Sequence, residues 1–254
     1  MEHRLTATAK RALAAMDLTS LGDNDREDGV RVLCRRATGP HGRVAAICVW
    51  PRFIAACQEE LAGTGVPVAV VANFPDGGAD LGHVISEIEA AIADGADEID
   101  VVWPWQAWLD GNRQAALDLL AASRSASANA VLKVILETGR LKDAGIIDAA
   151  SRAAIDAGAD FIKTSTGKVD VNATPEAAEI MLRAIADTGA NCGFKAAGGI
   201  RTVANAAIYF QLADRIMGAE WATPAKFRIG ASGLLDDCLA TLDGKAPGAP
   251  VKGY

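Results

Sequence analysis

The stretch that decides the fold runs from residue 158 to residue 202 and reads GADFIKTSTGKVDVNATPEAAEIMLRAIADTGANCGFKAAGGIRT. Two short apolar runs within it, 161–166 and 193–197, have the length and composition of β-strands. The segment between them, 175–187, is alanine-rich and has helical periodicity. The stretch therefore predicts a strand–helix–strand unit, the repeat from which parallel sheets are built.

The residues that flank this predicted helix support the same interpretation. The helix begins with an N-cap, a proline at its first position and an acid in its first turn, which are Thr174, Pro175 and Glu176 in that order. Gly189 can end the helix in the left-handed conformation. Related Asp-Gly-Ala phrases end two other predicted helices, at 94–97 and 156–160. Chain geometry explains this repeated phrase.

The same alternation extends along the whole chain. Strand-like runs begin about every 30 residues, the spacing of βα units, at 16–19, 44–50, 67–74, 98–103, 132–138, 161–166, 193–197 and 227–232. Helical segments lie between them, among them 82–94, 113–126, 144–157 and 175–187. The strands are apolar at nearly every position, as in a parallel sheet covered on both faces.

Eight such units predict an α/β protein with a (β/α)8 barrel. The alternative is a doubly wound open sheet, but no GxGxxG turn follows any strand. Barrels of about 250 residues are often one domain, so we expect residues 1–254 to form a single domain. The end of the chain, about 243–254, is rich in Gly, Pro and Lys and is expected to be a mobile tail.

Composition and charge exclude several classes of protein. Of the 254 residues, 50% are hydrophobic and 22% charged, which excludes a disordered chain. The net charge of −7, without a basic run, argues against nucleic-acid binding. Five cysteines without a CxxC spacing fit free thiols in a reducing compartment. No apolar run reaches the roughly 18 residues needed to span a membrane, and no secretory signal is visible, so we expect a cytoplasmic protein.

Two lysines interrupt neighbouring strands of the predicted barrel. If Ile162 faces the helices, Lys163 points into the barrel mouth, and Lys195 lies on the next strand. Two ammonium groups about 5 Å apart repel by roughly 3 kcal/mol at an effective dielectric near 20, or about two pKa units. A lysine kept neutral in this way is a nucleophile toward carbonyls. The alternative is that Lys163 is a strand-end lysine reaching out to water.

A carboxylate lies on another of these strands, at Asp100. A buried carboxylate needs a partner, and the lysine pair could supply one, so Asp100 could hold Lys195 charged and relay protons. A purely structural salt bridge is the alternative. Asp97 and Glu98, at the start of the same strand, are expected to face solvent.

Further candidates lie at the ends of other strands. Glycine-rich loops at 198–199 and 230–233 follow the last two strands, where barrels often bind phosphate. Cys48 ends the second strand, either as a pocket residue or as a small buried hydrophobe. The three histidines lie at none of the strand ends, and no metal-ligand spacing is present, so neither a metal nor a cofactor is expected.

These motifs resemble the deoxyribose-phosphate aldolase family, the Schiff-base-forming class I aldolases with a barrel fold. The resemblance extends over nearly the whole chain and is carried by 17–19, 47–48, 72–75, 95–102, 132–139, 158–168, 193–202 and 227–232. It implies reversible cleavage of 2-deoxy-D-ribose 5-phosphate to acetaldehyde and D-glyceraldehyde 3-phosphate, in deoxyribonucleotide catabolism.

The resemblance also implies roles for individual residues. Lys163 matches the Schiff-base lysine, Lys195 the lysine that perturbs it, and Asp100 the acid/base partner. The remaining positions expected to bind substrate are Asp17, Thr19, Cys48, Gly167, Lys168, Gly198, Gly199, Arg201, Ser232, Gly233 and Tyr254. Many relatives have a second serine where this chain has Gly233, which removes one hydroxyl from the phosphate end of the site.

Two other functions stay open at this point. One is a different Schiff-base aldolase of the same barrel class, and the other is a sugar-phosphate sensor that lost its chemistry. In each case the expected partners are small sugar phosphates and aldehydes, with no nucleic acid and no membrane, and the chain could form a homodimer.

Overall fold

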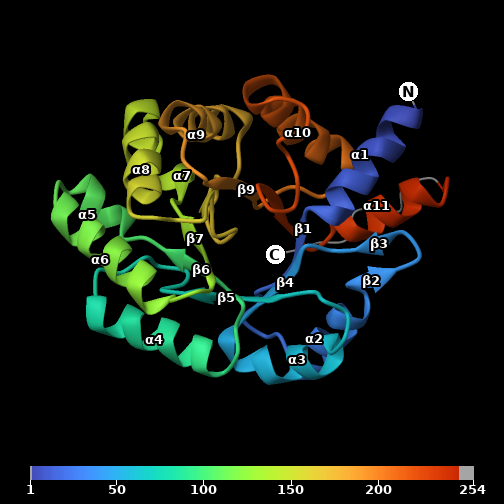
Figure 1. The fold of residues 1–254 in the computed structure, drawn as a ribbon, viewed down its shortest axis with the longest axis horizontal. Coiled ribbons are helices and arrows are strands. Elements are labelled where there is room, and N and C mark those ends of the chain that lie inside the picture. Colours follow the sequence, from blue (N-terminus) through green and yellow to red (C-terminus); the bar gives the residue numbers. More distant parts are fainter. Residues whose placement is uncertain (1, 246–254) are drawn as a thin grey trace.

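Eight parallel strands form a closed barrel in the computed structural model, which describes residues 2–245, with side chains from residue 5 onward. Around the barrel the strands follow the order β1-β10-β9-β8-β7-β6-β5-β4 (Figure 1). Their bounds are β1 (Met16–Ser20), β4 (Ala46–Val49), β5 (Val68–Ala72), β6 (Glu98–Val102), β7 (Val131–Ile135), β8 (Phe161–Lys163), β9 (Gly193–Ala197) and β10 (Phe227–Ala231). The predicted (β/α)8 barrel is confirmed.

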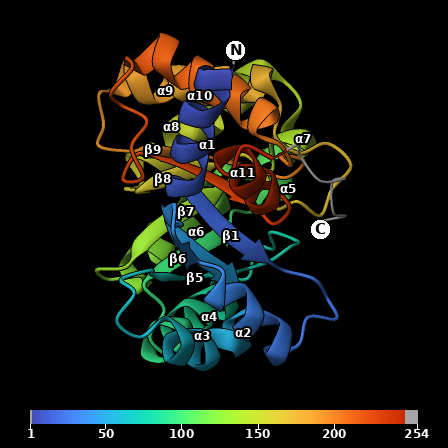
Figure 2. The ribbon, with the colours of Figure 1, turned by 90° about the vertical axis from the view of Figure 1, so that its right-hand side faces the viewer.

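Helices surround the strands in a ring (Figure 1). They are α1 (Glu2–Ala14), α2 (Glu27–Arg35), α3 (Ile54–Leu61), α4 (Leu81–Ala93), α5 (Trp105–Leu109), α6 (Arg113–Ala126), α7 (Thr138–Leu141), α8 (Ala144–Asp156), α9 (Pro175–Thr188), α10 (Val203–Met217) and α11 (Leu234–Leu242), with a 3-10 turn η1 (Pro51–Phe53) and a small hairpin of β2 (Thr38–Gly39) and β3 (Gly42–Arg43). The last helix, α11, packs beside α1, as the side view shows (Figure 2). Across residues 2–245, no helix combines the length and apolar character needed to cross a membrane.

The glycines predicted to end helices adopt the left-handed backbone, with φ of 98° at Gly95, 87° at Gly158 and 63° at Gly189. The acid that follows two of these glycines has a structural role. Asp97 accepts a hydrogen bond from the backbone N–H of Val68 at 2.8 Å, and Asp160 accepts one from Leu132 at 2.8 Å. Each carboxylate therefore joins the start of its own strand to the neighbouring one.

The strand starts were predicted more accurately than the strand ends. The runs 132–138 and 161–166 were each expected to stay extended, but β7 ends at Ile135 and β8 at Lys163. After β7 the chain turns at Glu137, whose φ of 54° and ψ of 56° lie in the left-handed region. Polar residues beyond each strand therefore lie in loops at the barrel mouth.

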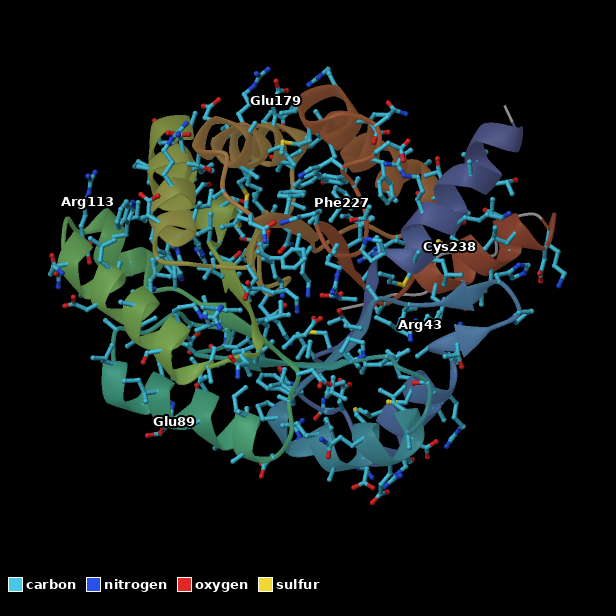
Figure 3. The ribbon with its side chains drawn as sticks, in the orientation of Figure 1. Arg43, Glu89, Arg113, Glu179, Phe227 and Cys238 are labelled. Carbon is cyan, nitrogen blue, oxygen red and sulfur yellow. The ribbon has the colours of Figure 1, made fainter. Side chains whose placement is uncertain are left out.

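Successive side chains along each strand point alternately toward the helices and into the barrel interior. Apolar side chains on one face pack against the helices, as where Phe227 stacks on Phe210 of α10 with ring centroids 4.6 Å apart (Figure 3). Charged side chains such as Glu89, Arg113 and Glu179 lie at the outside (Figure 3). The other face of each strand points into the barrel, and there one side of the interior is apolar and the other side is charged.

Part of the expected tail falls within the described residues. Positions 243–245 follow α11 and are exposed. The rest of the tail, Tyr254 included, lies outside the described residues.

Candidate active site

Seven charged side chains meet inside the barrel, and each is 0–7% exposed. They come from six strands, and their backbone neighbours, such as Ile99, Ile162 and Phe194, face the helices instead. The seven are Asp17, Glu98, Asp100, Lys133, Lys163, Lys195 and Arg228, here called the buried charge cluster.

Asp100 is the centre of the buried charge cluster. Its Oδ2 accepts hydrogen bonds from the Nζ atoms of both Lys163 and Lys195, each at 2.7 Å. Its Oδ1 accepts one from Lys133 Nζ, also at 2.7 Å. The two lysines on Oδ2 are direct neighbours in the parallel register between β8 and β9. The structure thus brings the lysine pair and Asp100 together at one carboxylate.

A second tier of ion pairs extends from this centre. Lys195 Nζ lies 2.5 Å from Asp17 Oδ2, and Asp17 Oδ1 lies 2.6 Å from Arg228 Nη1. Arg228 Nη2 in turn lies 3.0 Å from Glu98 Oε1, and Glu98 Oε2 lies 2.6 Å from Lys133 Nζ. The expectation that Glu98 faces solvent is wrong, because it shares the inward face of β6 with Asp100 and is 3% exposed. Asp97 is exposed, as expected.

The two lysines on Asp100 Oδ2 have opposite electrostatic character. Burial lowers the pKa of Lys163, and Lys195 lowers it further, while Asp100 acts in the other direction. Burial also disfavours the charge on Lys195, but Asp100 and Asp17 outweigh it and hold the pKa of Lys195 well above its ordinary value. Repulsion between the lysines was the cause expected from the sequence, whereas the larger cause for Lys163 is the loss of water around its amine.

The count of charges in the buried charge cluster also indicates that Lys163 is the uncharged lysine. The buried charge cluster contains three carboxylates and four cations. Asp100 is held ionised, with its pKa well below the ordinary value, because three lysines outweigh the effect of burial. Lys133 has its pKa raised to about 12 by Asp100 and Glu98 against the effect of burial. The cluster is therefore neutral when Lys163 is uncharged, and a buried net charge is costly.

Glu137 adds a further buried carboxylate just beyond the cluster, and it is 1% exposed. It accepts a hydrogen bond from Thr166 Oγ1 at 2.5 Å and one from the Thr166 backbone N–H at 3.3 Å. Burial raises the pKa of this carboxyl, against the effect of the Thr166 hydrogen bonds. Glu137 therefore anchors the loop that follows Lys163.

Small apolar residues form the opposite wall of the barrel interior. Ala46 and Cys48 of β4 pack with Ala69 and Val71 of β5, and Leu21 completes the group. Cys48 Sγ lies 3.9 Å from Asp100 Oδ2, and burial raises the thiol pKa. Cys48 is therefore a neutral thiol on an apolar wall beside the lysine pair.

A small hollow lies at the ends of β9 and β10. Its lining includes five of the residues expected to bind substrate, namely Gly198, Gly199, Arg201, Ser232 and Gly233. Gly198 and Gly199 have φ of 86° and 82°, and a Cβ on Gly198 would lie 2.6 Å from that of Asn172. Gly233 is the N-cap of α11 and provides no side-chain cap. Backbone N–H groups at such a helix start are suited to an anion.

Other predicted site residues lie elsewhere. Lys168, in the loop after Gly167, is not among the residues that line this hollow, and its Nζ lies 3.1 Å from Asp23 Oδ1. Thr19 is buried and donates its hydroxyl to the backbone oxygen of Asp17 at 2.7 Å. Tyr254 lies outside the described residues.

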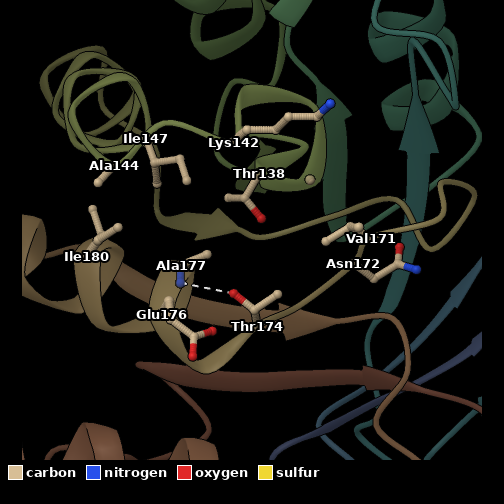
Figure 4. A pocket seen from close by; sticks show the side chains of 11 residues that line it. Thr138, Lys142, Ala144, Ile147, Val171, Asn172, Thr174, Glu176, Ala177 and Ile180 are labelled. Carbon is tan, nitrogen blue, oxygen red and sulfur yellow. Dashed lines mark hydrogen bonds between the residues drawn. The ribbon is translucent and has the colours of Figure 1, made fainter.

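A cavity of about 360 Å³ lies away from these groups, between α7, α8 and α9 (Figure 4). Its wall is mostly apolar, with Ile147 and Ile180 on one side and Val171 on the other, and Lys142 and Glu176 at its edge (Figure 4). Within residues 2–245, none of the residues predicted to act on substrate lines it. This cavity is therefore separate from the buried charge cluster and from the hollow at 198–201 and 230–233.

Four residues around the lysines were not among the predicted site residues: Glu98, Lys133, Glu137 and Arg228. A usable signal existed for all four, because Lys133 and Glu137 are polar residues that interrupt or end the predicted strand 132–138, and strand alternation points to the other two. Side chains two positions apart on a strand share a face, so Glu98 lies on the face of Asp100, and Arg228 on the face of Gly230. Their partners could not be inferred from the sequence, because they come from strands that lie far apart along the chain.

The fold and these groups together define a (β/α)8 barrel that encloses paired lysine amines and carboxylates in its interior, at the place where barrel enzymes carry their active sites. The chain belongs to the DeoC/LacD aldolase family, whose family model matches residues 11–240. A curated relative from Agrobacterium fabrum (strain C58 / ATCC 33970), named deoxyribose-phosphate aldolase, is 50% identical over 244 residues, which is 95% of this chain and 94% of the relative. The resemblance inferred from the sequence motifs is confirmed.

Solved structures show the same barrel. One from Toxoplasma gondii ME49 matches with a TM-score of 0.88 at 23% identity, over 97% of this chain and 98% of its own. The deoxyribose phosphate aldolase of Aeropyrum pernix, whose structure is tetrameric, matches with a TM-score of 0.74 at 24% identity, over 94% of this chain and 97% of its own. At these identities the two structures support the fold alone.

Proposed function

We propose that this chain is a class I aldolase that reversibly cleaves 2-deoxy-D-ribose 5-phosphate to acetaldehyde and D-glyceraldehyde 3-phosphate, with Lys163 as the Schiff-base lysine. Family membership and the relative at 50% identity support the aldolase class. The observation that carries the assignment of Lys163 is the charge balance of the buried charge cluster, in which Lys163 is the cation in excess of the carboxylates.

The chemistry follows from an uncharged Lys163. Its Nζ attacks the aldehyde carbon of the open-chain sugar, and loss of water leaves a protonated Schiff base. The hydroxyl on the third carbon then gives up its proton as the bond between the second and third carbons breaks, which releases glyceraldehyde 3-phosphate. The bonding electrons move into the iminium and form an enamine. Protonation of its terminal carbon and addition of water release acetaldehyde and free the lysine.

The proton steps need a donor and an acceptor within reach. Lys195 carries the donor protons, since its raised pKa keeps it charged. Asp100 is the acceptor between the two lysines, 2.7 Å from each amine. We propose that protons pass between these groups and bound water, and that the apolar wall around Cys48 faces the two-carbon aldehyde end of the substrate.

The phosphate end of the substrate is assigned to the hollow at 198–201 and 230–233. Glycine backbone at Gly198 and Gly199, the N-terminus of α11 and the charge of Arg201 suit a phosphate there. We also assign Asp17, Thr19, Gly167, Lys168 and Tyr254 to the substrate site, as the family resemblance implies.

Reductive trapping tests the proposal. Borohydride with 2-deoxy-D-ribose 5-phosphate should add a stable mass to Lys163, located by peptide mass spectrometry. The variant Lys163→Ala should lose the adduct and the release of aldehyde. An adduct retained in Lys163→Ala would remove the assignment. Release from fructose bisphosphate instead would favour the other Schiff-base aldolase, and binding without release would favour a sensor.

The location, partners, domain organisation and oligomeric state of the protein are also proposals. We propose a cytoplasmic enzyme of sugar-phosphate catabolism whose partners are small molecules, with residues 1–254 folding as one unit and the chains forming a homodimer. Light scattering on the peak that elutes from a size-exclusion column should give twice 26.3 kDa. Heating should give a single cooperative transition.

A further inference from the structure

Two residues of the buried charge cluster, Glu98 and Arg228, form no hydrogen bond or ion pair with Lys163 or Lys195 in the described structure, although Arg228 is the register neighbour of Lys195 across β9 and β10. Glu98 is 3% and Arg228 7% exposed, and their side chains pair at 3.0 Å. Each lies two positions before another inward-facing residue of its strand, Asp100 and Gly230 respectively, and so nearer the start of that strand. They form a base below the lysine pair, on the side away from the barrel mouth.

This base is connected to the site through one carboxylate, Asp17, and one lysine, Lys133. Arg228 Nη1 lies 2.6 Å from Asp17 Oδ1, and the other oxygen of Asp17 lies 2.5 Å from Lys195. Glu98 Oε2 lies 2.6 Å from Lys133, which in turn binds Asp100. Both routes end on the groups that contact Lys163 or its carboxylate partner. The ring of Phe161, 5.3 Å from the Arg228 guanidinium carbon, covers this arginine.

We propose that Glu98 and Arg228 are positioning residues that set the charge state of Lys163 by fixing the balance of carboxylates and cations in the buried charge cluster. The inference rests on the proposed Schiff-base role of Lys163 and deepens it. Neither residue contacts the reacting amine, so each acts only through Asp17, Lys133 and the charge that it contributes.

Charge counting predicts effects of opposite sign for the two residues. Without the cation of Arg228, the cluster has three carboxylates and at most three cations. The charges then balance only when Lys163 is protonated, so the Lys163 amine keeps its proton to higher pH. Without the charge of Glu98, only two carboxylates face the cations of the cluster. The excess of cations is then larger, so Lys163 loses its proton at lower pH. Removing both charges restores the original balance.

Other groups near Lys163 stay the same in all these variants. Asp100 approaches it from β6, Lys133 from β7, Lys195 from β9, Asp17 from β1 and Cys48 from β4, and Glu137 lies in the turn after β7. Burial keeps Cys48 as an uncharged thiol. Differences between the variants therefore report the removed charges and not these neighbours.

The experiment measures the pH at which Lys163 becomes reactive. Acetaldehyde is the probe, and cyanoborohydride traps the Schiff base in the wild type and in Arg228→Met, Glu98→Gln and the double variant, from pH 5.5 to 9.5. The rate of adduct formation, followed by intact mass, rises with pH as the amine loses its proton. A unit charge roughly 10 Å away at an effective dielectric near 20 moves that midpoint by about one pH unit.

We expect the midpoint to rise by about one unit in Arg228→Met, to fall in Glu98→Gln, and to return to within about 0.3 unit of wild type in the double variant. Arg228→Lys keeps the charge and should keep the wild-type midpoint, so it serves as the conservative control if Arg228→Met folds poorly. Circular dichroism checks the fold of every variant.

The outcomes separate this inference from the proposed function. Shifts of the same sign, no shifts, a double variant that does not return, or a moved midpoint in Arg228→Lys would each overturn the positioning role. An adduct that survives in Lys163→Ala would instead contradict the proposed function. A merely structural role predicts slower trapping at an unchanged midpoint.

Discussion

Removal of the Lys195 charge should reduce activity strongly at neutral pH and much less at alkaline pH. Lys163 and Lys195 both donate to Asp100 Oδ2 at 2.7 Å, so their nitrogens lie no farther apart than twice that distance. In Lys195→Met, Asp100 and Asp17 stay buried and lose one cation between them, and Lys163 becomes the partner that Asp100 needs.

The size of the effect follows from that separation. Two unit charges about 5 Å apart at an effective dielectric near 20 repel by roughly 3 kcal/mol, which equals about two pKa units. Raising the pKa of Lys163 by about two units lowers its neutral fraction by about 100-fold at pH values below the wild-type midpoint. The loss should shrink by about tenfold for each unit of pH above that midpoint until the new pKa is reached.

The assay is kcat/KM for release of aldehyde from 2-deoxy-D-ribose 5-phosphate between pH 6 and pH 10. Lys195→Arg, which keeps a cation, is the matched control and should keep the lower midpoint even if its rate is reduced. A Lys195→Met profile that is lower at every pH but has the wild-type midpoint would refute the reasoning, because Lys195 would then act only as a proton donor.

Three further predictions concern the phosphate hollow, the loop after Lys163 and the ion pairs. Gly233 has φ of −76° and ψ of −13°, which a serine adopts without strain, so Gly233→Ser should lower KM for the phosphorylated sugar about fivefold, one hydrogen bond of about 1 kcal/mol, and leave KM for 2-deoxyribose unchanged. Glu137→Ala should reduce kcat/KM about fivefold, one hydrogen bond of about 1 kcal/mol, while Glu137→Gln, which keeps an acceptor for Thr166, should retain most activity. Cations hold the pKa of Asp17 and Asp100 below ordinary values against the effect of burial, so both carboxylates contribute stability above the unfolded pKa of about 4 and lose it as pH falls below that value. Urea midpoints that stay constant from pH 5 to pH 3 would contradict this last prediction.

The architecture could be predicted from local signals. Eight apolar runs separated by helical segments required no knowledge of long-range contacts, and Gly95, Gly158 and Gly189 all take the predicted left-handed backbone. Strand ends were predicted less well, because a polar residue such as Glu137 is compatible with both a strand and the left-handed turn that it forms. Hydrogen bonds between strands, which the sequence does not display, decide where a ladder stops.

Part of the site could also be predicted from local signals and chain order. Lys163 and Lys195 lie on consecutive strands of the barrel, so chain order alone suggested that they are neighbours. Arg228 pairs with Asp17 and Glu98, which precede it by 211 and 130 residues. Only barrel closure brings β10 beside β1, and only the shared interior brings it to β6. A prediction made from each strand separately therefore placed Glu98 at the surface.

The cost of burying these charges supports a role in chemistry over one in stability. Moving an ion out of water costs several kcal/mol even inside a protein, and apolar replacements of buried ion pairs are often neutral or stabilising. The same barrel shows that apolar filling is possible, because Ala46, Ala69 and Val71 line the opposite wall. Barrel interiors are usually filled by branched apolar side chains. A carboxylate that contacts three lysines at 2.7 Å is not needed to close the barrel. Its effect is to keep one enclosed amine in excess and another charged beside it, which is the condition that the proposed Schiff-base chemistry requires.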